Sequence, residues 1–83
     1  MNIRARVLVR LKRGILDVQG NAVRRALKGL GYDDLRDLRV GKVIDVEVEA
    51  PDPAAAAARV EEMCRRLLAN PVTEDFAIEC PLP

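Results

Sequence analysis

The chain has 83 residues, a formal net charge of +1 at pH 7, and 49% hydrophobic and 33% charged residues. This length allows one domain at most, so we expect a single domain over residues 1–83 with a modest core. The near-neutral charge argues against general nucleic-acid binding. No stretch approaches the ~20 apolar residues of a membrane span, and no signal-peptide pattern follows the first charges. We therefore expect a cytoplasmic protein with no membrane or nucleic-acid partner.

Cys64 and Cys80 are the two cysteines, and the chain has no histidine. Two cysteines without histidine cannot complete a four-ligand structural zinc site within one chain, and their spacing does not form a CxxC redox motif. We expect both to be reduced and to act as small hydrophobic residues. No metal or cofactor is expected to bind this chain.

Residues 3–11 alternate between apolar and basic side chains, which predicts a strand with one buried face. Ile3, Ala5, Val7, Val9 and Leu11 share one face. The opposite face carries Arg4, Arg6 and Arg10. These arginines could form a phosphate site, but pairing with acids on a neighbouring strand is the favoured interpretation.

Asp17 is the predicted N-cap of a helix that continues to about Leu30, because its carboxylate can accept from free N–H groups of the first turn. Gly31 suits the left-handed residue just past the helix end. A glycine such as Gly20 in the first turn lowers the stability of a helix by roughly 1 kcal/mol relative to alanine. Either this cost is simply tolerated, or another backbone approaches Gly20 closely. The helix carries one narrow apolar stripe, made of Ala22, Val23, Ala26, Leu27 and Leu30.

Residues 35–49 predict one long strand, bent or bulged at Gly41, with a hairpin turn at Gly41-Lys42 as the alternative. The even-numbered apolar residues share one face of a continuous strand: Leu38, Val40, Ile44, Val46 and Val48. At ~3.3 Å per residue this strand would be about 40 Å long or more. Such a strand overhangs a small sheet, and a second copy of the chain is the simplest partner for the overhang.

Asp52-Pro53 predicts a second helix, with an N-cap followed by proline at the first helical position. Its apolar stripe is Val60, Met63, Cys64, Leu67 and Leu68. Asn70-Pro71 ends this helix, because the residue before proline disfavours the α conformation. A last strand over about 74–80 would bury Phe76 and Ile78.

The predicted fold is α+β with a β-α-β-α-β order and a long middle strand. One mainly antiparallel sheet would be covered on one face by both amphipathic helices. Ferredoxin-like halves would then be completed across a dimer.

The chain shows no constellation that supports catalysis. Histidine and serine are absent, and the carboxylates fit helix caps, cross-strand pairs or helix-surface pairs. An RNA-binding sheet would need aromatic residues for bases to stack on, and Tyr32 and Phe76 are the only aromatics. We therefore expect an interaction or structural module with no catalytic residues and no activity alone.

Three stretches carry a family resemblance: residues 12–23, 38–42 and 62–75. The strings Leu-Asp-Val-Gln-Gly at 16–20 and Leu-Leu-Ala-Asn-Pro-Val-Thr-Glu-Asp at 67–75 resemble the small PurS subunit of phosphoribosylformylglycinamidine synthase. The chain departs from the family pattern at Val18, where proline is frequent, and at Thr73, where a branched apolar residue is frequent. Proline at a helix start mostly restricts the unfolded chain, so neither departure is expected to be disabling.

The resemblance implies a non-catalytic subunit of a three-component enzyme of de novo purine biosynthesis. This subunit, as a homodimer or tetramer, would bridge a glutaminase subunit and a large synthetase subunit and assist ammonia transfer between them. The whole complex would use glutamine, ATP and magnesium to convert formylglycinamide ribonucleotide to formylglycinamidine ribonucleotide. The alternative is a small-metabolite-binding regulatory module of ferredoxin-like type.

The resemblance places partner contacts in the same three stretches. The first surface would comprise Lys12, Gly14, Leu16, Asp17, Gln19 and Gly20, the second Arg39, Gly41 and Lys42, and the third Asn70 and Pro71. Local structure offers another explanation for some of these residues. Asp17 could be only a helix cap, Gly41 only a bulge and Asn70-Pro71 only a helix stop.

Overall fold

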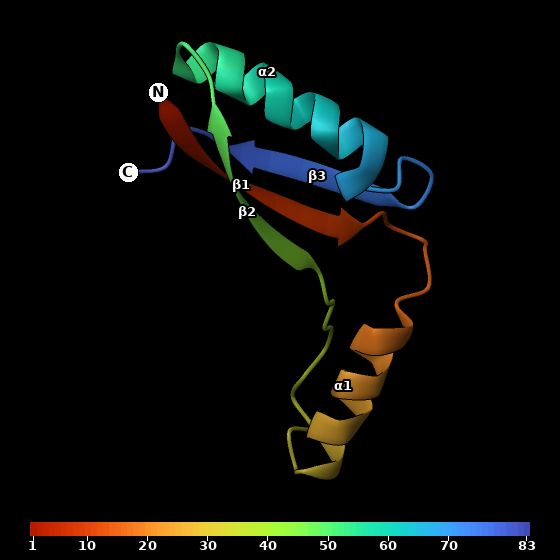
Figure 1. The fold of residues 1–83 in the computed structure, drawn as a ribbon. Coiled ribbons are helices and arrows are strands. Elements are labelled where there is room, and N and C mark those ends of the chain that lie inside the picture. The colour runs from red at the N-terminus through yellow and green to blue at the C-terminus, as the bar shows by residue number, and fades with distance from the viewer.

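The computed structural model describes residues 1–83 as three strands and two main helices (Figure 1). In chain order they are β1 (Asn2–Leu11), α1 (Val18–Gly29), β2 (Lys42–Glu49), α2 (Pro53–Met63), the π-helical turn η1 (Cys64–Leu68) and β3 (Glu74–Glu79). The strands form one antiparallel sheet in the order β2-β1-β3. The predicted β-α-β-α-β order and antiparallel sheet are confirmed.

The core lies between the sheet and α2. Four odd-numbered residues of the central strand β1, namely Ile3, Ala5, Val7 and Val9, are buried as predicted, with Val7 and Val9 at 0% and 1% exposure. Leu11, at the end of the strand, is only half-buried. Val60 and Cys64 pack on them from the helical side and are also fully buried. The aliphatic pattern of β1 and the stripe of α2 therefore make the single helix-on-sheet layer of this chain.

The middle strand is shorter than predicted. β2 begins at Lys42, which lies opposite Val9, and residues 35–41 have no strand partner within the chain. The backbone N–H of Val40 donates instead to the Asp17 carboxylate at 2.9 Å. The prediction of one strand over 35–49 is therefore wrong for a single chain, because a side chain near α1 takes a donor that a strand would use. No hairpin turn occurs at Gly41-Lys42, and the alternating burial of β2 follows the predicted parity.

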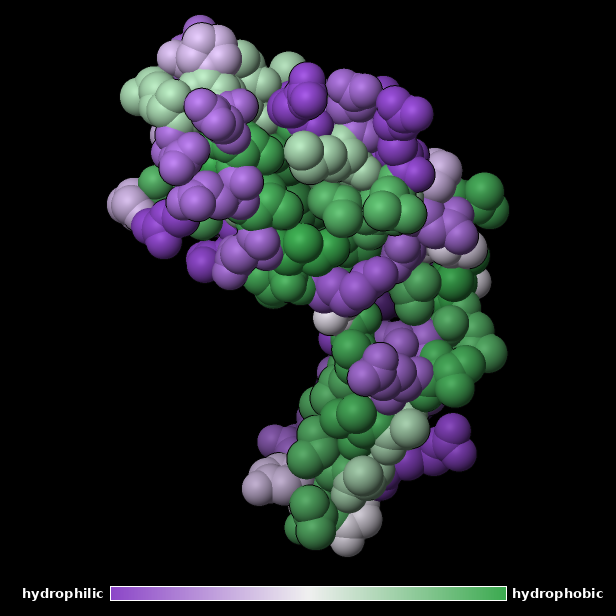
Figure 2. Space-filling model, viewed as in Figure 1, coloured by the Kyte–Doolittle hydropathy of each residue, from purple (hydrophilic) through white to green (hydrophobic).

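α1 stands away from the sheet and gives the molecule an elongated shape of 51 × 28 × 14 Å. Figure 1 shows it as a separate arm, so the expectation that both helices cover one face of the sheet is wrong for a single chain. Its boundaries agree with prediction, with Asp17 as N-cap and Gly31 at φ +102°. Its apolar stripe faces solvent, as Leu30 at 76% exposure illustrates, and Figure 2 shows hydrophobic surface along the arm.

α2 starts as predicted, since the Asp52 carboxylate accepts from the N–H of Ala55 at 2.8 Å. The apolar stripe then shifts in η1, where the N–H of Ala69 donates to the Cys64 carbonyl five residues back at 3.0 Å. This wider turn buries Ala69 and leaves Leu67 84% exposed. The prediction of Leu67 as a core residue is wrong because a π turn rotates the residues after it relative to an α-helical stripe.

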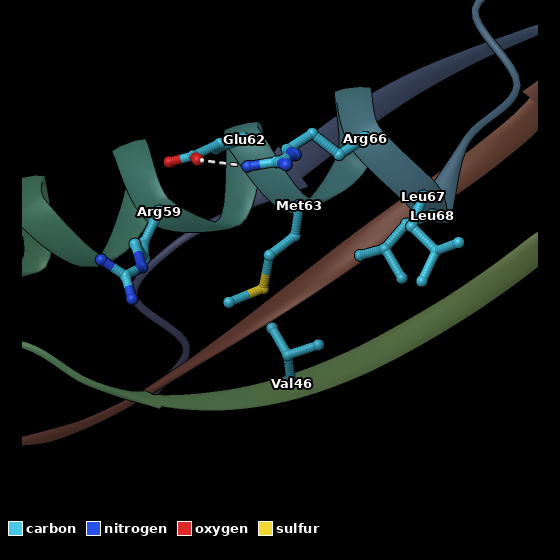
Figure 3. A pocket seen from close by; sticks show the side chains of 7 residues that line it. All are labelled: Val46, Arg59, Glu62, Met63, Arg66, Leu67 and Leu68. Atoms are coloured by element: carbon cyan, nitrogen blue, oxygen red, sulfur yellow. Dashed lines mark hydrogen bonds and ion pairs between the residues drawn. The ribbon is translucent and has the colours of Figure 1, made fainter.

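A groove of about 510 Å³ lies beside α2 and η1, along the inner face of β2 (Figure 3). Met63 and Val46 point toward each other across it. Its lining is Val46, Arg59, Glu62, Met63, Arg66, Leu67 and Leu68. The groove therefore continues the apolar face of the sheet beyond the area that α2 covers.

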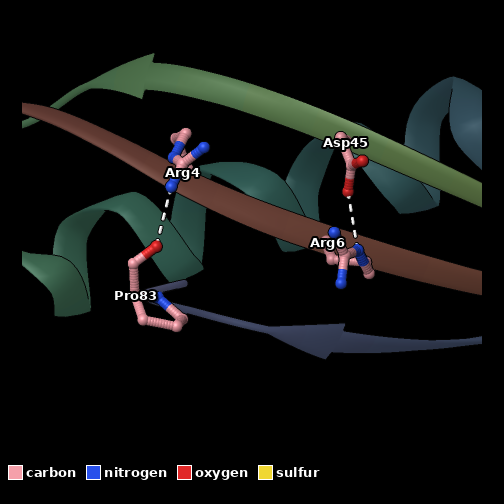
Figure 4. A network of polar contacts seen from close by, with 4 residues as sticks. All are labelled: Arg4, Arg6, Asp45 and Pro83. Atoms are coloured by element: carbon pink, nitrogen blue, oxygen red, sulfur yellow. Dashed lines mark hydrogen bonds and ion pairs between the residues drawn. The ribbon is translucent and has the colours of Figure 1, made fainter.

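The outer face of the sheet is mostly polar, apart from Leu8, Val43 and Ala77, which lie side by side on it. Arg6 Nε donates to Asp45 Oδ1 at 2.8 Å, which confirms cross-strand pairing for this arginine (Figure 4). Arg4 donates instead to the carbonyl of Pro83 at 2.7 Å. Both side chains of the Arg6–Asp45 pair are more than 40% exposed, so the pair contributes little to stability.

Candidate partner interface at the foot of α1

The three stretches that carried the resemblance meet at one place. The N–H of Lys12 donates to the Thr73 carbonyl at 2.8 Å. Arg39 Nη2 donates to the Lys12 carbonyl at 3.3 Å, and the N–H of Val40 reaches Asp17. We call residues 11–20, 38–42 and 70–75 the junction. Three surfaces that are distant in sequence are therefore one continuous region at the foot of α1.

Asp17 holds the junction together. Its Oδ1 accepts from the N–H of Gly20 at 2.8 Å and caps α1, while its Oδ2 accepts from the N–H of Val40 at 2.9 Å. The hydrogen bond from Val40, followed by that from Gly20, lowers the pKa of this carboxyl below its ordinary value. Asp17 is therefore more than a helix cap, because its carboxylate also connects the start of α1 to the segment that leads into β2.

Two junction glycines leave no room for a side chain, Gly41 because of backbone and Gly20 because of the Asp17 carboxylate and the Leu38 backbone. A Cβ on Gly41 would lie 2.6 Å from the Val9 carbonyl oxygen. A Cβ on Gly20 would lie 2.7 Å from Asp17 Cγ and 3.0 Å from the Leu38 carbonyl oxygen. The interpretation of Gly20 as a site of close backbone approach is therefore confirmed.

The turn after α2 is organised by Asn70. Its Oδ1 accepts from the N–H of Val72 at 3.0 Å, and its own N–H donates to Glu74 Oε1 at 2.8 Å. Lys42 Nζ lies 3.5 Å from the other Glu74 oxygen and links this turn to β2. Asn70 thus shapes the turn, while the neighbouring Pro71 is exposed.

The junction exposes apolar side chains around this polar frame. Leu16 is 70% exposed, and it is joined by Val18 at 68% and Val72 at 76%. Gly14, at φ +85°, and Gln19 are also exposed. Val18 and Val72 also lie in the junction, and the contact residues predicted from the sequence did not include them. Their positions in the sequence could have indicated them. Val18 follows the capping residue Asp17, and Val72 lies in the turn that Asn70 organises, and neither belongs to the apolar stripe of a helix.

Cys64 is the one ionisable side chain of the chain that is buried. The Cys64 thiol is buried, and burial, followed by nearby Glu61, raises its pKa. No group of three or more His, Cys, Asp or Glu side chains is placed to hold a metal ion. No helix has both the length and the apolar character needed to cross a membrane.

A family model and individual relatives both match almost the whole chain to PurS. The family model described as PurS, phosphoribosylformylglycinamidine (FGAM) synthase, matches residues 4–81. The PurS subunit of Methanocaldococcus jannaschii is 38% identical over 76 residues, which cover 92% of each chain. The PurS subunit of Bacillus subtilis is 41% identical over 76 residues, covering 92% of this chain and 89% of the relative.

Solved structures agree in fold. The crystal structure of M. jannaschii PurS superposes with a TM-score of 0.85 at 35% identity and covers 100% of this chain and 99% of that one. A chain of the PurLQS structure from Thermotoga maritima superposes with a TM-score of 0.87 at 29% identity, covering 96% and 98%. With its three-stranded sheet, its displaced α1 and these matches, the chain belongs to the PurS family of phosphoribosylformylglycinamidine synthase subunits.

Proposed function

We propose that this chain is the non-catalytic small subunit of a phosphoribosylformylglycinamidine synthase complex in de novo purine biosynthesis. The observation that carries the proposal is the match of nearly the full chain to PurS proteins, including a chain of the PurLQS structure. In the cytoplasm, residues 1–83 act as one domain that bridges a glutaminase subunit and a synthetase subunit. The complex, rather than this chain, uses glutamine, ATP and magnesium to convert formylglycinamide ribonucleotide to formylglycinamidine ribonucleotide.

The junction is the proposed contact surface for the partner subunits. Its polar frame fixes the loops by the Asp17 and Asn70 hydrogen bonds, so little conformational freedom is lost on binding. Its exposed Leu16, Val18 and Val72 supply apolar area of the kind that interface cores bury. A closed contact of this kind excludes water, which helps ammonia pass between active sites without entering bulk solvent.

The chain works as a homodimer or a higher assembly. α1 exposes most of its apolar stripe, with Leu27 alone half-buried, and it packs on no strand or helix of its own chain. The groove beside β2 is open and is lined by four apolar and three charged residues. β2 also lies at an edge of the sheet, where unpaired backbone groups favour pairing with another strand. In a symmetric dimer, α1 and residues 35–41 of one copy cover the sheet of the other, which completes the two ferredoxin-like halves.

Assembly tests the proposed role. The chain is mixed with separately purified glutaminase and synthetase subunits, and the mass of the mixture is measured by light scattering after gel filtration. A ternary complex that forms only when this chain is present is the expected result. If the other two subunits associate equally well without it, the bridging role is wrong. Heat released when the isolated chain is titrated with amino acids or nucleotides would favour the metabolite-binding alternative.

A further inference from the structure

Beside the apolar part of the junction lies a recess of about 680 Å³ that is lined mainly by charged residues. Three arginines come from three different segments: Arg10 from the end of β1, Arg13 from the loop that follows, and Arg39 from the connection into β2. All three are exposed. The rest of the lining is Leu11, Gly14, Asp37 and Asp75.

None of these arginines has an ion-pair partner within 4.0 Å. The ion pairs of the chain are Arg6–Asp45, Lys42–Glu74, Arg65–Glu61 and Arg66–Glu62. Arg10 lies directly opposite Asp75 in the sheet register, where cross-strand pairing was expected, but the two side chains do not form such a pair. The recess therefore holds three guanidinium groups, none of which forms an ion pair within 4.0 Å, although Asp37 and Asp75 also line it.

One of the three is already held in place. Arg39 Nη2 donates to the carbonyls of Leu11 at 3.5 Å and Lys12 at 3.3 Å, which fixes its guanidinium over the end of β1. A guanidinium carries five N–H donors in a planar fork, so Arg39 keeps most of its donors free. Carboxylates match this fork and accept two parallel hydrogen bonds from it. The two lining aspartates leave a net excess of one positive charge in the recess.

We propose that this recess binds an acidic segment of a partner subunit, with carboxylate side chains placed between Arg10, Arg13 and Arg39. This inference rests on the proposed function as a complex subunit. Exposed charges attract a free small anion only weakly, because water screens them. A carboxylate carried on a protein that also covers Leu16, Val18 and Val72 would meet the arginines in a partly desolvated setting, where pairing is stronger. Charge at the rim of an apolar contact also speeds association.

A charge-reversed variant tests the proposal in the reconstituted complex. Arg10→Glu combined with Arg13→Glu removes two arginines that make no hydrogen bond within the chain. Because position 10 lies opposite Asp75 in the sheet, where like charges repel, circular dichroism and urea unfolding check that the fold remains intact. Arg25→Glu with Lys28→Glu, on the exposed side of α1, makes the same change in net charge elsewhere. The association rate with the partner subunits is measured at low and high salt, together with the mass of the free chain.

We expect association of the Arg10/Arg13 variant at low salt to be slower by about tenfold or more and less sensitive to salt. The control variant should stay near the wild-type rate, and both should keep the wild-type mass. Wild-type association of the Arg10/Arg13 variant would overturn the proposal while leaving the subunit role intact. So would a change of its mass, which would make the recess a contact between copies. Binding of inorganic phosphate to the isolated chain at micromolar concentration, lost in the variant, would assign the recess to a free anion instead.

Discussion

Asp17 shows how one carboxylate can set the geometry of a whole arm. It accepts hydrogen bonds from the first turn of α1 and from Val40, so it joins two segments that are distant in sequence. Its role as N-cap could be predicted from the sequence because a cap depends on local spacing. Its bond to Val40 could not, because that contact depends on how the chain returns to the sheet.

The effect of Asp17 on stability should depend on pH. Its pKa is lowered in the folded chain, so its contribution is present above the unfolded pKa of about 3.9 and is lost as the pH falls through the lower folded value. Asp17→Asn keeps an oxygen that can cap α1 but loses the charge and the second acceptor. In urea unfolding, the variant should be less stable than wild type at neutral pH, and the difference should shrink toward about pH 3. A difference that stays constant over this range would contradict the account.

Gly41 and Gly29 provide a matched pair of alanine substitutions. Gly41→Ala forces a methyl group against the Val9 carbonyl, so it should lower the free energy of unfolding by roughly 1–3 kcal/mol. Gly29→Ala, at the end of α1 with nothing within 4 Å of the added carbon, should raise it by up to about 1 kcal/mol. Chemical denaturation of both variants checks the signs, and equal effects would argue against close packing at Gly41.

Among the elements, α1 departs most from expectation. Its boundaries and caps follow local rules and could be predicted, but its place could not. Amphipathicity shows that a helix has an apolar face, and it does not show which surface covers that face. The same limit explains Leu67, because the π turn that exposes it leaves an ordinary helical pattern in the sequence.

The uncovered face of α1 predicts the behaviour of a stripe variant. Val23→Asp places a carboxylate where the second copy should bury the helix, so the dimer dissociation constant should rise by more than about tenfold. Arg25→Asp, on the same helix but outside the stripe, is the control and should leave it nearly unchanged. Sedimentation velocity measures both, and circular dichroism checks that the helix is intact. A dimer equally stable in the two variants would show that α1 is not part of the contact.

At the scale of the whole molecule, the helices and strands and their order along the chain could be predicted from the sequence better than their arrangement in space. The alternation of β1 and the Asp52-Pro53 start of α2 follow from patterns within each segment. The meeting of the three stretches at the foot of α1 depends on contacts such as Lys12 with Thr73, which have no local signature. A family resemblance marked these stretches as important, and the structure shows that they are neighbours.

The most direct test of the central claim is the rate of formylglycinamidine ribonucleotide formation by the separate glutaminase and synthetase subunits, with and without this chain. Glutamine and ammonium salts are compared as nitrogen sources. If the chain couples the two active sites, adding it should restore synthesis from glutamine, while synthesis from high ammonium should depend on it far less. The chain alone should form no product. A full glutamine-dependent rate without the chain would contradict the account.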